Sequence, residues 1–202
     1  MDTKLEEMIT ARNVPGTQDR LKAGHVAVAG LGGLGSNVAV MLARLGVGSL
    51  LLVDFDTVEP SNLNRQHYMI PHLGMPKTEA LKSQLRDINP FVEVQTRDIR
   101  ITAENAGDIF AGYSIVVEAL DDPACKADLV GALLALGNTK IVAASGMAGV
   151  GSANDIQTRR RLKNLYICGD LESDAGADVG LMAPRVMVCA GHQANVVARL
   201  LM

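Results

Sequence analysis

The chain has 202 residues, enough for one domain with a substantial core, and 48% of them are hydrophobic while 20% are charged. A net charge of −3 provides no basic field for binding nucleic acid. No apolar run approaches the ~20 residues that cross a bilayer, and the charged first residues lack the apolar centre of a signal peptide. We therefore expect no nucleic acid or membrane among the partners, and a cytoplasmic location.

Apolar strands and amphipathic helices alternate from the N-terminus to residue 144. The segment LLLV at residues 50–53 is wholly apolar, which is typical of a strand buried on both faces of a sheet. Residues 57–76 are predicted to be irregular, apart from a short turn near 61–65. This order predicts an α/β fold, a Rossmann-like, mostly parallel sheet with helices on both faces. The predicted helices are 3–12, 36–45, 77–88, 103–110 and 123–136, and the predicted strands are 25–29, 50–53, 92–96, 114–119 and 140–144.

After residue 145 the pattern weakens and indicates a mixed or antiparallel part. We predict a glycine-rich strand near 146–151, a strand at 164–168, an acidic loop at 169–180 and a long apolar helix at 184–201. The glycine-rich strand and the long helix are the surfaces that we expect to bury against a second copy. We interpret the basic run at 159–161 as a solvated face, with a docking patch for an acidic protein as the sharper alternative.

The three cysteines are too few and too far apart for a disulfide framework. No Cys-x-x-Cys pair occurs, which excludes a four-cysteine zinc site within one chain. We interpret Cys125 and Cys189 as core residues because they fall in apolar helical segments. For Cys168 we favour a small buried residue over a catalytic thiol. His192 lies in an apolar helix, and we interpret it as a hydrogen-bonded core histidine, not a metal ligand.

A glycine turn follows the first predicted strand. Residues 30–35 read GLGGLG and fit G-x-G-x-x-G between a strand and a helix, where glycines let the backbone approach a nucleotide and the helix N-terminus attracts an anion. Asp54 closes the next strand, where such folds bind the ribose hydroxyls. Asp56 faces the same way if that strand continues. The unit does not distinguish NAD, FAD, SAM and ATP, and its nucleotide-binding residues are Gly30, Gly32, Gly33, Gly35, Asp54 and Asp56.

The residues beyond the glycine turn favour ATP. Ligands of open parallel sheets bind outside the carboxyl ends of the strands, and Asp121 lies just beyond such an end. Arg65 and Lys77 can reach the same crevice from the intervening segment. Two cations and a further acid suit a triphosphate with Mg²⁺, which takes one or two carboxylates and phosphate oxygens. We assign Mg²⁺ to Asp121 and the neutralisation of phosphate charge to Arg65 and Lys77. The alternatives are that Lys77 is a solvated helix residue, and that Asp121 or Asp122 only caps the next helix.

The segments GLGGLG, DFDTVEPSNLNRQ, GMPK and ALDD resemble the ThiF/MoeB/HesA family, bacterial relatives of the ubiquitin-activating enzymes. The similarity runs from about Gly24 to the C-terminal helix, and SNLxRQ after DxD is more specific than the glycine pattern. The family adenylates the C-terminal glycine carboxylate of a small ubiquitin-like sulfur carrier and releases pyrophosphate. The resemblance implies that Asn62, Arg65 and Lys77 contact the phosphates, that Gln66 supports them, and that Asp121 holds Mg²⁺.

Larger members of the family carry two zinc-binding Cys-x-x-Cys pairs, which this chain lacks. It therefore resembles the compact ThiF-like branch of thiamine biosynthesis, whose usual carrier is ThiS, and we expect no zinc. The resemblance also implies a homodimer in which the partner's N-terminal arm donates an arginine, with Arg12 as the first candidate and Arg20 as the second. We expect a single domain with an arm (1–20), a nucleotide-binding core (25–145) and a crossover segment with the C-terminal helix (146–202).

Other functions stay open from the sequence. The glycine turn also fits an NAD-dependent oxidoreductase, although SNLNRQ is then unexplained and no acid or base for hydride transfer is apparent. A non-catalytic adaptor is a further alternative, and the intact set of Arg65, Lys77 and Asp121 argues against it. Within the leading hypothesis the carrier could be MoaD of molybdopterin synthesis in place of ThiS, because the two carriers end alike.

Overall fold

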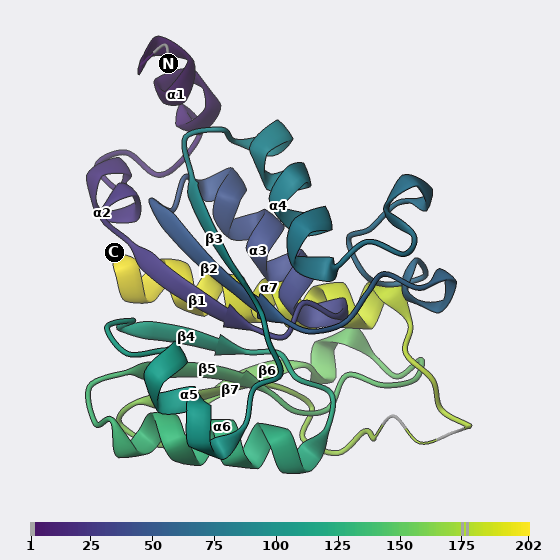
Figure 1. Ribbon diagram of the computed structural model, residues 1–202. Coiled ribbons are helices and arrows are strands. Elements are labelled where there is room, and N and C mark those ends of the chain that lie inside the picture. Colours follow the sequence, from purple (N-terminus) through teal and green to yellow (C-terminus); the bar gives the residue numbers. More distant parts are fainter. Residues whose placement is uncertain (1–2, 175, 177) are drawn as a thin grey trace.

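A seven-stranded sheet forms the centre of the computed structural model, which describes residues 3–174, 176 and 178–202 (Figure 1). The strand order is β3-β2-β1-β4-β5-β7-β6, and the pairs are parallel except for β6 and β7, which are antiparallel. The predicted α/β fold with a mixed C-terminal part is confirmed. The strands are β1 (His25–Ala29), β2 (Ser49–Asp54), β3 (Glu93–Asp98), β4 (Ile115–Glu118), β5 (Lys140–Ala144), β6 (Gln157–Arg160) and β7 (Leu165–Gly169).

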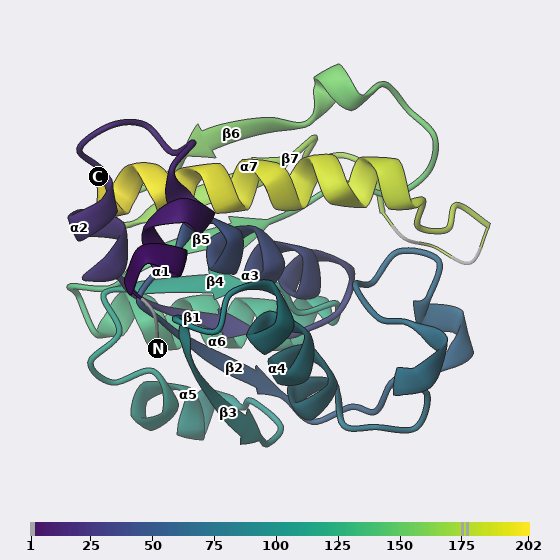
Figure 2. The same cartoon turned by 90° about the horizontal axis from the view of Figure 1, so that it is seen from above.

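Helices cover both faces of the sheet, as Figures 1 and 2 show. Side chains of β1 alternate between two apolar clusters: Val26 and Val28 pack with α3, α4 and α7, while Ala27 and Ala29 pack with α5 and α6. Burial on both faces explains why the central strands are apolar throughout. The helices are α1 (Thr3–Thr10), α2 (Gln18–Lys22), α3 (Gly33–Leu45), α4 (Lys77–Ile88), α5 (Ala103–Ile109), α6 (Pro123–Ala135) and α7 (Ala183–Leu201).

Most predicted elements are confirmed, and β1, α4 and β5 have the predicted bounds. Three findings differ. The strand predicted near 146–151 is wrong, because the structure has no strand there and Gly146 and Gly149 take left-handed φ angles of 81° and 73°, which a regular strand does not contain. The short helix α2 and the edge strand β6 were not predicted. Helix α3 begins at Gly33, three residues before the predicted start, since its glycines adopt helical geometry where close packing needs them.

The segment between β2 and α4 contains no long helix or strand, and short backbone hydrogen-bonded turns hold it in place. It contains two short 3-10 helices, Pro60–Asn62 and Ile70–His72, and a bridge between Thr57 and Pro76. The buried Tyr68 donates a hydrogen bond of 2.9 Å from its hydroxyl to the carbonyl oxygen of Leu31, inside the glycine turn. This bond fixes the segment against the turn. Among the described residues, no helix has the length and hydropathy needed to span a bilayer.

Candidate functional site

A cavity of about 510 Å³ opens at the carboxyl ends of the strands. Its wall is formed by the residues that follow β1, β2, β3, β4, β5 and β7, together with Arg65, Gln66 and Lys77 from the connecting segment. This is the edge at which open α/β sheets bind ligands. The predicted site residues at this wall are Gly30, Gly32, Gly33, Asp54, Asp56, Arg65, Gln66, Lys77 and Asp121.

The glycine turn is built for close approach. Gly30 has a left-handed φ of 89°, and a Cβ there would lie 2.7 Å from the carbonyl oxygen of Ala119. Gly32 and Gly33 line the cavity at the N-terminus of α3, whose free amides and positive dipole end face it. Gly35 does not line the cavity; a Cβ there would lie 1.8 Å from the oxygen of Gly30, so its glycine is required for packing the helix against the turn.

Asp54 is buried at the end of β2, with 8% of its surface exposed. Its Oδ2 accepts a hydrogen bond of 2.6 Å from the amide of Leu31, and its Oδ1 accepts one of 2.8 Å from the amide of Asp56. Burial raises the pKa of Asp54, although the charge of nearby Lys77 and the hydrogen bonds from the two backbone amides oppose the rise. Because β2 ends at Asp54, the two acids do not project from one continuous strand as the sequence suggested.

Lys77 is buried, and its Nζ lies 2.7 Å from Oδ2 of Asp56, an ion pair at the cavity wall. The interpretation of Lys77 as a solvated helix residue is therefore wrong. Arg65 also lines the cavity, and its Nη1 donates to the oxygen of Ser61 at 3.1 Å and to Oδ1 of Asn64 at 2.8 Å. Two cations thus stand at one wall, held by neighbouring oxygens.

Gln66 and Asn62 have different positions although they are near in sequence. Gln66 lines the cavity, and its buried Oε1 has no hydrogen-bond partner among the described residues. Asn62 does not line the cavity; its Oδ1 accepts a bond of 3.0 Å from the amide of Glu59 and closes a 3-10 turn. The structure therefore does not bring Asn62 to the wall where phosphates were predicted to bind.

The sequence left open whether Asp121 and Asp122 bind a metal ion or cap the next helix, and the two residues differ in this respect. Asp122 is the N-cap of α6 and accepts a hydrogen bond of 2.8 Å from the amide of Cys125, which lowers the pKa of Asp122. Asp121 is exposed and lines the cavity. A single accessible carboxylate is the kind of protein ligand that Mg²⁺ takes together with phosphate oxygens and water. In the described part of the chain, no group of three or more acidic, His or Cys side chains could hold a metal by itself.

The sequence profile described as "ThiF family" matches residues 5–202. The chain belongs to the ThiF family. Its curated relatives include the sulfur carrier protein adenylyltransferase of Thermus thermophilus, which is 40% identical over 123 residues, or 60% of this chain and 45% of that protein. The molybdopterin-synthase adenylyltransferase of Haemophilus influenzae is 41% identical over 106 residues, or 52% and 44%. The matched region thus spans less than half of either relative's length.

Solved structures share the fold. Escherichia coli tRNA N6-threonylcarbamoyladenosine dehydratase, TcdA, in complex with AMP has a TM-score of 0.88 and 22% identity, over 100% of this chain and 96% of that chain. At this identity the likeness concerns the fold. Escherichia coli MccB with AMPCPP and MccA has a TM-score of 0.74 and 26% identity, over 92% of this chain and 57% of that chain.

Several residues of this ThiF-family cavity were not predicted. Glu118 is buried at the end of β4, and Lys126 donates to both of its oxygens at 2.8 Å while also lining the cavity. The guanidinium of Arg100 lies 5.0 Å above the ring of Phe55 at the wall beyond β2 and β3. Asn37 donates from one amide group to the oxygens of Gly33 and Arg65 and so ties the turn to the cation-bearing segment. Sequence spacing gives no signal for such pairs, since each depends on tertiary geometry.

The cysteines differ in setting. Cys125 is partly exposed and lines the cavity, so the prediction that it is a core residue is wrong. Cys168 and Cys189 are fully buried, as expected, and burial raises their thiol pKa values to about 11 and about 12. His192 is hydrogen-bonded, with its Nδ1 2.9 Å from Oγ1 of Thr158, but it is partly exposed and does not lie in the core.

The N-terminal arginines and the basic run lie away from the cavity. Helix α2 lies beside the C-terminus, at the end of the sheet opposite to the cavity (Figures 1 and 2). Arg12 and Arg20 are not among the cavity residues, and Arg20 instead donates to the carbonyl oxygen of Met202. The basic run belongs to the edge strand β6 and the residue after it. Its Arg159 donates to Gly169 at 3.1 Å and its Arg160 to Lys163 at 2.8 Å, so these side chains are already bonded to backbone oxygens.

Proposed function

We propose that this protein is an ATP-dependent adenylyltransferase that activates the C-terminal glycine carboxylate of a small ubiquitin-like sulfur carrier. The observation that carries the proposal is one cavity that combines a glycine turn, a buried acid at Asp54, the cations Arg65 and Lys77, and the accessible acid Asp121. Family membership favours this activity over an NAD-dependent oxidoreductase. The relatives named as sulfur carrier and molybdopterin-synthase adenylyltransferases support the same reaction class.

The chemistry needs charge neutralisation more than proton transfer. The carrier carboxylate is ionised at neutral pH, so no general base is required. One of its oxygens forms a bond to the α-phosphorus of ATP, the bond from that phosphorus to the bridging oxygen breaks, and pyrophosphate leaves with the electron pair. Two anions must meet, so alignment and cations are the main catalytic requirement.

Several cavity residues have a role in this proposal. Asp54 accepts hydrogen bonds from the ribose hydroxyls, and the amides at Gly32 and Gly33 bind phosphate oxygens. Arg65 and Lys77 stabilise the charge that develops on the phosphates. Mg²⁺, when bound by Asp121 and the phosphates, would add further charge neutralisation.

The finer assignments are part of the proposal. ThiS is our first choice of carrier because the sequence resembles the thiamine branch, and MoaD is the alternative. We infer a homodimer in which Arg12 of one copy completes the cavity of the other, which is consistent with its absence from the lining of the cavity in its own chain. We infer that residues 1–202 belong to one domain.

The proposal is tested by exchange of pyrophosphate into ATP, measured with Mg²⁺ and with purified ThiS-like and MoaD-like carriers that end in Gly-Gly. We expect exchange that depends on the carrier and disappears when its last glycine is removed. The carrier that gives the higher kcat/KM identifies the pathway. Absence of exchange with every Gly-Gly carrier would contradict the proposal.

A further inference from the structure

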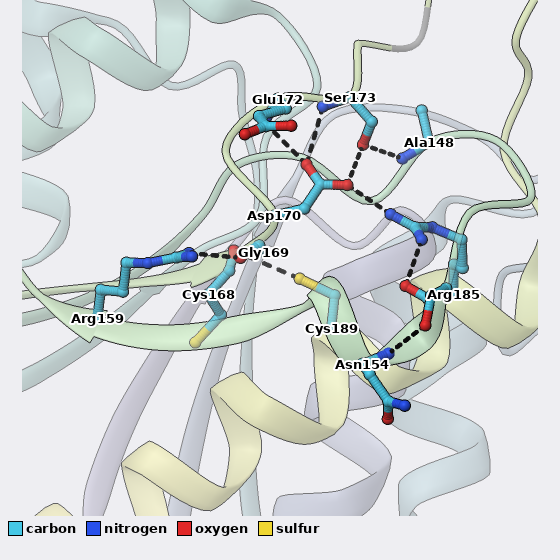
Figure 3. Close-up of polar contacts among 11 residues, drawn as sticks. Ala148, Asn154, Arg159, Cys168, Gly169, Asp170, Glu172, Ser173, Arg185 and Cys189 are labelled. Carbon is cyan, nitrogen blue, oxygen red and sulfur yellow. Dashed lines mark hydrogen bonds and ion pairs between the residues drawn. The ribbon is translucent and has the colours of Figure 1, made fainter.

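A buried ion pair joins the end of β7 to the first turn of α7, outside the set of nucleotide-site residues (Figure 3). Nη2 of Arg185 lies 2.5 Å from Oδ2 of Asp170, and the two side chains are 6% and 11% exposed. Nη1 of Arg185 donates to the carbonyl oxygen of Ser152 at 2.7 Å. Charges withdrawn from water add little net stability, so such a pair is better explained by a geometric requirement than by a gain in stability.

The carboxylate of Asp170 organises the turn that follows it. Its Oδ1 accepts hydrogen bonds of 2.8 Å from the amides of both Glu172 and Ser173, and its Oδ2 also accepts one of 2.7 Å from the hydroxyl of Ser173. That hydroxyl oxygen in turn accepts a bond of 3.0 Å from the amide of Ala148 (Figure 3). Leu171, at the centre of the turn, has a φ of 70°, a conformation that a branched side chain keeps only when its surroundings impose it.

Glycines make room for this arrangement. A Cβ at Gly146 would lie 2.0 Å from Oδ1 of Asp170, and a Cβ at Gly151 would lie 2.9 Å from Nη1 of Arg185. The amide of Asp170 donates to the oxygen of Gly146 at 2.9 Å. The segment after β5 therefore packs directly against the ion pair, and this close packing explains why the segment is rich in glycine.

The held segments form one side of the cavity. Along the sheet, Asp54 ends β2, the glycine turn follows β1 and Asp121 follows β4. The residues after β5 and β7 come next in the strand order, and they line the cavity with Ser145, Gly146, Met147, Ala148, Leu171, Glu172, Ser173 and Asp174. With a nucleoside at β2 and its phosphates near β1 and β4, this side is where an attacking carboxylate has room to approach.

We propose that Asp170 and Arg185 are positioning residues whose ion pair holds the turn of Leu171, Glu172 and Ser173 as the carrier-binding wall of the cavity. This inference rests on the proposed function. Arg185 also neutralises Asp170, the carboxylate that organises this turn. The ion pair acts on the side of the cavity remote from Asp54, the proposed ribose-binding residue. Loss of the pair therefore impairs binding of the carrier and leaves binding of ATP intact.

The test compares KM values for the carrier and for ATP in pyrophosphate exchange, with the Gly-Gly-ended carrier that gives the higher activity. Asp170→Asn and Arg185→Met should each raise KM for the carrier roughly tenfold to a hundredfold while changing KM for ATP less than about twofold. The double variant leaves no lone buried charge, so it stays folded even if a single variant does not. Arg185→Lys keeps the charge but not the two-pronged bonding, and should recover part of the loss.

Arg199→Met is the matched control, because it makes the same substitution at an exposed position near the other end of α7. It should leave both KM values unchanged. If the ion pair were purely structural, its loss would lower thermal stability and would change the KM values for both substrates alike. An unchanged KM for the carrier in the folded double variant overturns the inference.

Hydrogen exchange of the backbone amides gives a readout without activity. In Asp170→Asn the amides of Glu172, Ser173 and Ala148 should exchange faster than in the wild-type protein, because each depends on the carboxylate directly or through Ser173. Equal exchange rates overturn the inference. A wild-type protein that is inactive with every carrier contradicts the proposed function instead, and the exchange rates still decide whether the ion pair holds the turn.

Discussion

Asp54 and Asp170 are two largely buried carboxylates at the carboxyl ends of β2 and β7, and they differ in their electrostatic setting. Asp54 ends β2, and burial raises its pKa. The hydrogen bonds from two backbone amides and the charge of Lys77 offset this rise only in part. Burial acts on Asp170 as well, but hydrogen bonds from the turn that follows and the charge of Arg185 outweigh it and lower the pKa. The environment of Asp54 thus stabilises its charged form less than water does, whereas the residues around Asp170 stabilise its charged form and are themselves held by it.

Asp121→Ala, at the cavity wall, is expected to have the largest effect. We expect pyrophosphate exchange to fall at least about a thousandfold, because a metal ion contributes several kcal/mol to stabilising charge in a reaction of this kind. The fold should be unaffected, since Asp122 and not Asp121 caps α6. Asp128→Ala, at an exposed site on α6, is the control. Retained activity in Asp121→Ala would mean that the metal lies elsewhere.

Lys77→Met tests whether the cations on this side serve chemistry more than binding. Removing the charge should lower kcat about a hundredfold and also leave Asp56 as an unpaired anion beside the phosphates. Lys77→Met combined with Asp56→Asn should therefore recover part of the loss. A change confined to KM for ATP, measured by steady-state kinetics, would argue against a transition-state role.

The packing of the glycine turn can be separated from its chemistry with Gly35→Ala. The added methyl would overlap the backbone oxygen of Gly30, so we expect a loss of about 1–3 kcal/mol in the free energy of unfolding, together with weaker ATP binding. Gly191→Ala, within α7, meets no atom within 4 Å and should instead stabilise the protein by up to ~1 kcal/mol. Urea denaturation measures both. Equal stabilities would show that the turn tolerates a side chain.

The smallest expected effect concerns pH. Because the pKa of Asp170 is lowered on folding, its contribution to stability is present above the ordinary value of 3.8 and is lost as the pH falls through the lower folded pKa. The raised pKa of Asp54 has the opposite sign, so its cost appears as the pH rises from 3.8 through the folded value.

Thermal midpoints measured across this acidic range test the contrast. The deficit of Asp170→Asn relative to wild type should shrink on acidification, while Asp54→Asn should gain relative to wild type as the pH rises. Parallel profiles for the two variants would show that the two carboxylates do not differ as described.

Sequence reasoning succeeded where the signal was local. Apolar runs and capping patterns located β1, α4 and β5, and the rule of strand ends located Asp54 and Asp121. It failed for β6, whose residues QTRR show no apolar alternation because the strand lies at the sheet edge. It gave no role to Arg185, which falls within the predicted helix at 184–201, because the pairing of Arg185 with Asp170 depends on tertiary structure and produces no sequence periodicity.

The bond from Tyr68 to Leu31 has a consequence for spectroscopy. The chain has no tryptophan and only three tyrosines, so its intrinsic fluorescence comes from very few positions. Tyr166, on β7, has the guanidinium of Arg160 above its ring. Tyr113 precedes β4 at the amino ends of the strands. Tyr68 is the one tyrosine whose hydroxyl donates to the glycine turn, so we expect its fluorescence to change when a nucleotide binds there, without any added label.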